Sequence, residues 1–84
     1  MDEQKYIDEL KIIITPYVED KSLLEKLKLE TRFLEDLRVN SANLIDIILD
    51  VEDKYDITVE DDEMDKMLNV GDSIAVIKAK LEAK

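Results

Sequence analysis

Apolar side chains at helical spacing dominate this sequence, and only one glycine and one proline interrupt them. Apolar residues recur every three or four positions over 2–18, 41–55 and 70–81, which is the period of an α-helix with one buried face. Pro16 disfavours helical geometry at Thr15, so the first helix is expected to end or kink there. No segment is a credible strand. The pattern therefore predicts an all-α fold.

The most strongly predicted helix covers residues 41–55, and either Asn40 or Ser41 is suited to cap its N-terminus. One stripe of its side chains is the expected core face: Leu44, Ile47, Ile48, Val51 and Tyr55. A second apolar strip lies about 100–160° around the helix and consists of Ala42, Ile45 and Leu49. Carboxylates surround this strip. Periodicity alone leaves two alternatives open, exposure to solvent or burial beneath the preceding connection.

That connection, over residues 19–40, is long for so small a domain and must be held by its own apolar side chains. The candidates are Leu27, Leu29, Phe33, Leu34 and Leu37. Ser22 and Glu25 have the spacing of a capping box, which predicts a short helical turn inside the connection.

A short third helix is expected over residues 61–68, with Met64, Met67 and Leu68 facing inward. Asn69, followed three residues later by Asp72, indicates the N-terminus of the last helix. The apolar positions of that helix are Val70, Ile74, Ile77 and Leu81. The prediction is one domain over 1–84, a four-helix bundle of three longer helices and one short helix with a long loop between the first two.

Acidic side chains outnumber basic ones by 22 to 12, giving a net charge of −10. Residues 41–65 hold ten carboxylates and one lysine, a net charge of −9. This field repels nucleic acid and anionic lipid and steers the chain toward basic protein surfaces. The N-terminus lacks a signal-peptide pattern and no apolar run approaches about 18 residues, so we expect a cytoplasmic protein without membrane insertion.

Histidine and cysteine are both absent, which removes the usual general bases, nucleophiles and zinc ligands. A single glycine excludes a glycine-rich phosphate loop. A calcium loop starting at Asp50 places Tyr55 where the sharp turn requires glycine. We therefore interpret the chain as a docking or carrier module for basic partner proteins, with no dedicated metal site and no catalytic residues of its own.

The segment from Phe33 to Ala42, Phe-Leu-Glu-Asp-Leu-Arg-Val-Asn-Ser-Ala, resembles the phosphopantetheine attachment region of acyl carrier proteins. In that family the motif runs F-x-E-D-L-G-x-D-S-L. The residues that match it are Phe33, Glu35, Asp36, Leu37 and Ser41. Three positions depart from it: Arg38 replaces Gly, Asn40 replaces Asp and Ala42 replaces Leu. The resemblance continues in register to the last helix, whereas the first helix fits the family by position only.

The resemblance implies that Ser41 carries a covalent 4′-phosphopantetheine arm, which holds acyl groups as thioesters for fatty-acid, polyketide or related biosynthesis. The chain is expected to be a monomer, and the implied partners are a phosphopantetheinyl transferase and acyl-processing enzymes with basic docking patches. The expected docking face comprises Asn40, Ala42, Ile45, Asp46, Leu49, Glu52 and Asp53. The expected acyl-chain pocket comprises Leu44, Ile47, Ile48, Val51 and Met64. The alternatives are an aminoacyl or peptidyl carrier of the same fold and an unloaded adaptor that only binds partners.

Overall fold

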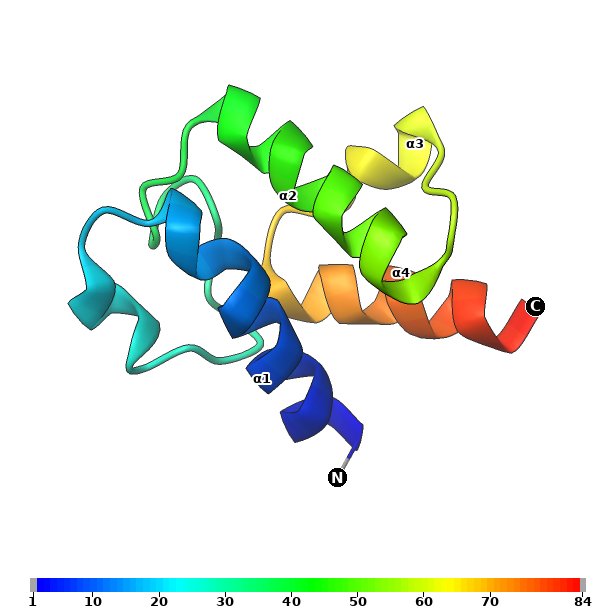
Figure 1. The fold of residues 1–84 in the computed structure, drawn as a ribbon, viewed down its shortest axis with the longest axis horizontal. Helices are drawn as coiled ribbons and strands as arrows, with labels where there is room; N and C mark the ends of the chain where they lie inside the picture. The colour runs from blue at the N-terminus through cyan, green and yellow to red at the C-terminus, as the bar shows by residue number, and fades with distance from the viewer. Residues whose placement is uncertain (1, 84) are drawn as a thin grey trace.

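The computed structural model describes residues 2–83, which form helices and loops with no strand. In chain order the elements are α1 Asp2–Ile14, the 3-10 turns η1 Thr15–Tyr17 and η2 Lys21–Leu24, α2 Ser41–Tyr55, α3 Asp61–Met64 and α4 Val70–Ala83. Helix α1 packs against both α2 and α4, and the long α1–α2 connection wraps around one end of the molecule (Figure 1). The predicted all-α bundle, with three longer helices, one short helix and a long loop, is confirmed.

Helix α1 ends at Ile14, immediately before the turn that contains Pro16, as the sequence predicts. Leu10 and Ile14 are fully buried. The turn places the hydroxyl of Tyr17 2.8 Å from Oδ2 of Asp50 on α2, to which it donates a hydrogen bond. That hydrogen bond is the main reason why the pKa of Tyr17 is raised. The end of α1 is thereby joined to the middle of α2.

The α1–α2 connection is held by its own buried side chains: Val18, Leu24, Phe33, Leu37 and Val39. Leu34 was expected among them, but it is exposed, because Phe33 and Leu37 take the inward positions of the turn and Leu34 falls on its outer side. The predicted turn near Ser22 is present, but the predicted capping residue is wrong, because the cap is Asp20. Asp20 Oδ1 accepts the Ser22 backbone N–H at 3.1 Å, and hydrogen bonds from Ser22 lower the pKa of Asp20.

The predicted third helix is longer than the one observed, because α3 is a single turn that ends at Met64. Residues 68–71 instead pair with the α1–α2 connection: Phe33 N donates to Leu68 O, Val70 N to Thr31 O and Gly71 N to Leu29 O. This pairing leaves Leu68 53% exposed, contrary to its predicted inward orientation, whereas Met67 is buried as expected. A Cβ atom at Gly71 would lie 3.1 Å from Leu29 O, which is tighter than an ordinary contact, so the close approach favours glycine at this position.

Two polar contacts position α3 and α4. Asn69 Oδ1 accepts the backbone N–H of Asp72 at 2.7 Å, which confirms the predicted cap of α4. Lys80 Nζ of α4 lies 2.7 Å from Oε1 of Glu63 in α3. This ion pair is the largest cause of the lowered pKa of Glu63 and of the raised pKa of Lys80. The short α3 is thus tied to the last helix.

Candidate functional site

Ser41 is the first residue of α2, and its side chain is exposed. The helix begins here because Asn40 has extended backbone geometry and its Oδ1 accepts the Asn43 N–H at 2.8 Å. The carbonyl of Asn40 accepts the first helical N–H, from Leu44, at 3.0 Å. Of the two caps that the sequence allowed, the structure contains Asn40. The Ser41 hydroxyl is therefore outside the cap and faces solvent at the positive end of the helix dipole.

Arg38 lies three residues before Ser41 and has left-handed backbone geometry, with φ 58°. Its neighbours are fixed on both sides, since Leu37 N donates to Arg32 O and Val39 N donates to Phe33 O. Leu37 and Val39 are both buried, and the left-handed residue between them turns both side chains inward. Glycine is the residue that adopts this geometry without strain. The position therefore explains physically why the resembled motif has glycine, and the arginine here is a departure.

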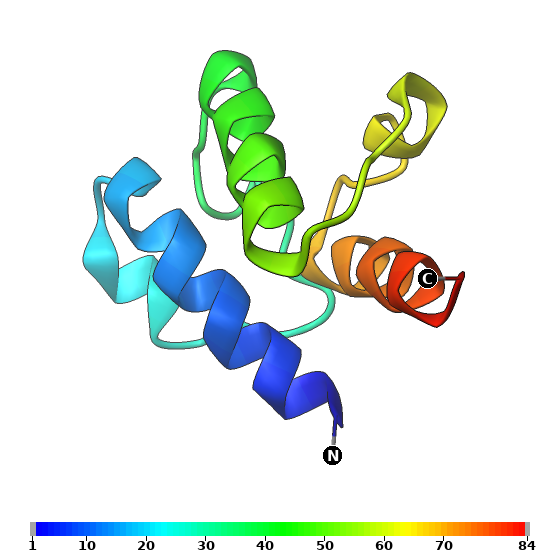
Figure 2. The ribbon, with the colours of Figure 1, turned by 45° about the vertical axis from the view of Figure 1, so that its right-hand side comes forward.

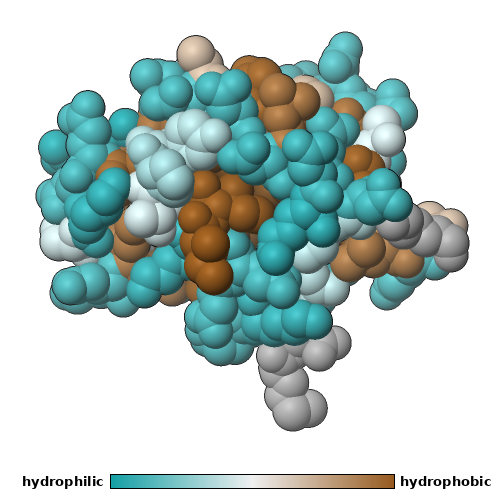
Figure 3. Space-filling view, viewed as in Figure 1, coloured by the Kyte–Doolittle hydropathy of each residue, from teal (hydrophilic) through white to brown (hydrophobic). Residues whose placement is uncertain are grey.

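The second apolar strip of α2 is on the surface, because Ile45 is 48% exposed and Leu49 is 49% exposed. Ala42 is exposed as well, as are the acidic Asp46 and Asp53 on the same side of the helix. Burial beneath the α1–α2 connection is thus excluded for this strip. On the face drawn in Figure 3, apolar side chains form separate patches that are bordered by hydrophilic residues. The docking role of the strip remains a prediction.

Glu52 was predicted to belong to the docking face, but it differs from its neighbours. Its side chain is half-buried, and Oε2 accepts the backbone N–H of Val59 at 2.7 Å. Helical periodicity contains no signal for this bond, because Val59 lies beyond the end of α2 and its position depends on the tertiary fold. Glu52 therefore has a structural partner in addition to its place beside Asp53.

The residues predicted to line an acyl-chain pocket lie together in the core. Ile47, Ile48 and Val51 are 1–2% exposed, and Leu44 and Met64 are partly buried against the same cluster. They are packed against one another and their neighbours, so an acyl chain can enter only by displacing side chains. Their role in holding an acyl chain remains a prediction.

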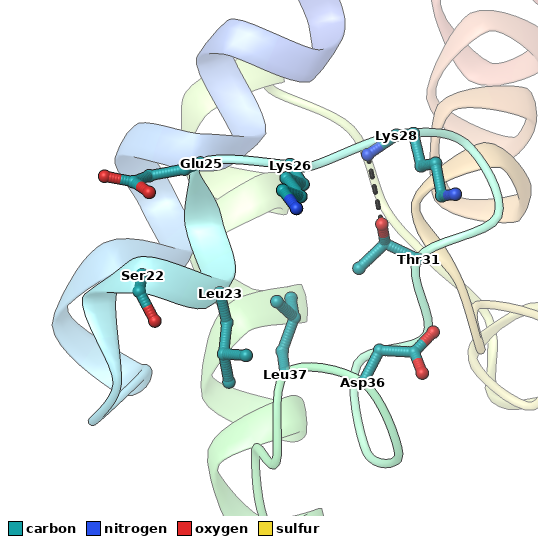
Figure 4. Close-up of a pocket in the computed structure, with 8 residues that line it drawn as sticks. All are labelled: Ser22, Leu23, Glu25, Lys26, Lys28, Thr31, Asp36 and Leu37. Atoms are coloured by element: carbon teal, nitrogen blue, oxygen red, sulfur yellow. Dashed lines mark hydrogen bonds between the residues drawn. The ribbon is translucent and has the colours of Figure 1, made fainter.

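A surface hollow of about 620 Å³ lies elsewhere, within the α1–α2 connection (Figure 4). Its lining residues are Ser22, Leu23, Glu25, Lys26, Lys28, Thr31, Asp36 and Leu37. The Lys28 N–H donates to Thr31 Oγ1 at 3.0 Å across one side of it. None of the residues predicted for docking or for the acyl chain lines this hollow. Within residues 2–83, no acidic cluster has a metal-binding arrangement, and no helix has the length and apolar character needed to cross a bilayer.

Comparison with known proteins gives consistent relatives, although no protein-family model matches the chain. It is 32% identical over 80 residues to the acyl carrier protein of Lactobacillus acidophilus, an alignment that covers 94% of this chain and 96% of that protein. It is 41% identical over 56 residues to the acyl carrier protein of Nitratidesulfovibrio vulgaris, covering 67% and 74% of the two chains. The corresponding protein of an Exiguobacterium species is 42% identical over 52 residues, covering 62% and 66%.

The fold has a solved counterpart in the acyl carrier protein of Enterococcus faecalis, with a TM-score of 0.75 and 18% sequence identity, covering 95% of this chain and 99% of that one. At this level of identity the likeness shows a shared fold, a small helical bundle. The relative from Lactobacillus acidophilus, which is matched over nearly its full length, shows the family to which this chain belongs. The chain belongs to the acyl carrier protein family, and its role is that of a carrier protein.

Proposed function

We propose that this chain carries acyl groups as thioesters on a 4′-phosphopantetheine arm attached to Ser41, and that it has no catalytic activity of its own. The observation that supports this most is the position of Ser41. It is the exposed first residue of α2, it occupies the serine position of the family motif, and Asn40 supplies the helix cap in its place. Attachment of the arm therefore leaves the cap intact.

The physical setting suits a phosphodiester at Ser41. The first turn of α2 contains no acidic side chain, so an anion there meets the positive end of the helix dipole without local repulsion. The arm ends in a thiol, which supplies the sulfur that a chain without cysteine lacks. The net charge of −9 over residues 41–65 favours an acyl carrier over an aminoacyl or peptidyl carrier, since the latter are generally less acidic.

Loading in vitro tests this proposal. The apo protein is incubated with coenzyme A and a broad-specificity phosphopantetheinyl transferase, and the adduct is located by digestion and mass spectrometry. We expect one adduct, on Ser41, which disappears in Ser41→Ala. Ser22→Ala is the matched control, because Ser22 is also exposed, and it should load as the parent does. An adduct on another serine contradicts the assignment, and no adduct favours the unloaded adaptor.

We also propose that partner enzymes dock on the exposed strip of α2 through a basic surface. Exposed carboxylates act mainly on the association rate and are screened by salt, whereas a buried apolar contact acts on dissociation. Burying the remaining half of Leu49 is worth about 1–1.5 kcal/mol. We therefore expect Leu49→Ala to raise the dissociation rate about tenfold at any ionic strength, and Asp53→Asn to lower the association rate mainly at low salt.

Surface plasmon resonance with the transferase measures both rates, in a Ser41→Ala background that prevents turnover. Ile12→Ala is the control for Leu49→Ala, since Ile12 is an apolar residue on α1 that is 74% exposed. It should leave both rates unchanged. Equal effects of the two variants, or a salt-independent effect of Asp53→Asn, place the docking surface elsewhere.

A further inference from the structure

Glu52 holds both ends of the short segment that follows α2. Its backbone carbonyl accepts the N–H of Asp56 and, at 3.1 Å, the N–H of Ile57. Its side-chain Oε2 accepts the N–H of Val59 at 2.7 Å. The carbonyl bonds are those of an ordinary helix end. The side-chain bond is not part of an ordinary helix end. It fixes Val59, the third residue after Asp56, to Glu52 as well.

The segment over residues 57–59 closes one side of the core. Ile57 and Val59 are buried in the same cluster as Ile47, Ile48 and Val51, while Thr58 between them is exposed. Beyond this segment the chain reverses direction relative to α2 and leads into α3 (Figures 1 and 2). Movement of this segment would therefore uncover the side chains predicted to hold an acyl chain.

Glu52 also faces the docking surface. It is only half-buried, it adjoins Asp53 in the sequence, and it lies one helical turn after Leu49. A carboxylate forms stronger hydrogen bonds with a cationic partner than with a neutral backbone N–H. An arginine or lysine of a docked protein that reaches Glu52 thus competes directly with the Val59 N–H.

We propose that Glu52 is a positioning residue that couples docking of a basic partner to opening of the core. In the free carrier its carboxylate keeps residues 57–59 closed over the core. When a partner's cationic side chain pairs with that carboxylate, the bond to Val59 is lost and the segment loosens. The ion pair between Glu63 and Lys80 keeps α3 attached to α4 meanwhile. This inference rests on the carrier function proposed above.

Amide hydrogen exchange measured by NMR at Val59 tests the inference in two stages. In the free protein, Glu52→Ala should speed exchange at Val59 about tenfold, as expected for loss of one hydrogen bond. Asp53→Ala is the matched control and should leave that exchange unchanged. Glu52→Gln should retain most of the protection, because the amide oxygen of glutamine still accepts the Val59 N–H.

The second stage adds the broad-specificity transferase to carriers with the Ser41→Ala substitution. Binding should speed exchange at Val59 when Glu52 is present. It should leave exchange unchanged in Glu52→Gln, because glutamine lacks the negative charge that attracts the partner's cationic side chain. A purely structural role for Glu52 predicts no difference between these two proteins. Unchanged or slower Val59 exchange on binding overturns the inference, and so does an equal response of the two proteins.

Loading of Ser41, measured in the protein with no substitution, tells whether a negative result contradicts only the coupling through Glu52 or also the proposed carrier function. If Ser41 is loaded and Val59 does not respond, the coupling is wrong and the carrier function stands. If the transferase neither binds nor loads the chain, both are wrong.

Discussion

The two ends of α2 share one unusual backbone feature but differ in how the neighbouring chain is held. Arg38, before the helix, and Asp56, after it, are the two non-glycine residues in 2–83 with positive φ, at 58° and 54°. After Asp56 the chain enters the core: Ile57 and Val59 are buried, and the Glu52 side chain accepts a hydrogen bond from Val59 N–H. After Arg38 the chain is held by Val39 and by the side-chain cap of Asn40, and Ser41 is left exposed.

This difference bears on the two tasks proposed for α2, attachment of the arm and docking of partners. The start of α2 depends on one polar cap that is independent of Ser41, so a bulky group can be attached there at little cost to the fold. The far end depends on apolar burial and on the side-chain bond from Glu52 to Val59. Substitutions at the far end should therefore affect the fold strongly, whereas those at the start should affect it weakly.

The largest expected effect is at the far end. Ile57→Ala should lower the free energy of unfolding by about 2–4 kcal/mol, because it removes buried methyl groups and leaves a cavity. Thr58→Ala, at the exposed neighbouring position, should change it by less than about 0.5 kcal/mol. Urea denaturation measures both. Similar values for the two variants would mean that the segment does not pack as described, and the contrast between the helix ends would fail.

An intermediate effect is expected at the cap. Asn40→Ala should lower the free energy of unfolding by about 1 kcal/mol, through loss of the bond to Asn43. Ser41→Ala should change it by less than about 0.5 kcal/mol, since the hydroxyl takes no part in the cap. The same denaturation experiment compares them. A larger loss from Ser41→Ala than from Asn40→Ala would show that the serine is the true cap.

The smallest effect sharpens the comparison at Arg38. The left-handed geometry costs a non-glycine residue about 1–2 kcal/mol. Glycine removes this cost, but its greater freedom in the unfolded chain offsets about 0.5–1 kcal/mol of the gain in stability. Arg38→Gly should therefore stabilise the fold by about 0.5–1 kcal/mol. Arg38→Ala should not, because alanine keeps the strain. Equal stability of the two variants in urea would show that the backbone at this position relaxes.

Local signals in the sequence were enough for most of the fold. The bounds of α2, the end of α1 before Pro16 and the cap at Asn69 depend on neighbouring residues, and all are confirmed. The errors arise where distant segments bond. Pairing of residues 68–71 with 29–33 exposes Leu68 and shortens the third helix, and no helical pattern contains that information. The cap at Asp20 was missed because Ser22 and Glu25 fit an alternative motif equally well.

The candidate site was predictable in part for a similar reason. Ser41 and its surroundings form a contiguous motif, so a linear comparison with a family finds them. The strip of Ala42, Ile45 and Leu49 was visible as a periodicity, but only the fold shows that it is exposed. The second role of Glu52 depends on where Val59 returns to the helix, and this contact between residues seven apart lies outside any repeat of α2.

The central claim is that the open start of α2 carries the arm. Intact mass spectrometry of the protein purified from its own cell, followed by peptide mapping, tests it most directly. We expect the purified protein to contain one phosphopantetheine group, on the peptide that includes Ser41, with acyl thioesters on part of the population. Protein from actively growing cells that has only its unmodified mass would contradict the claim, and so would a phosphopantetheine group on any other residue.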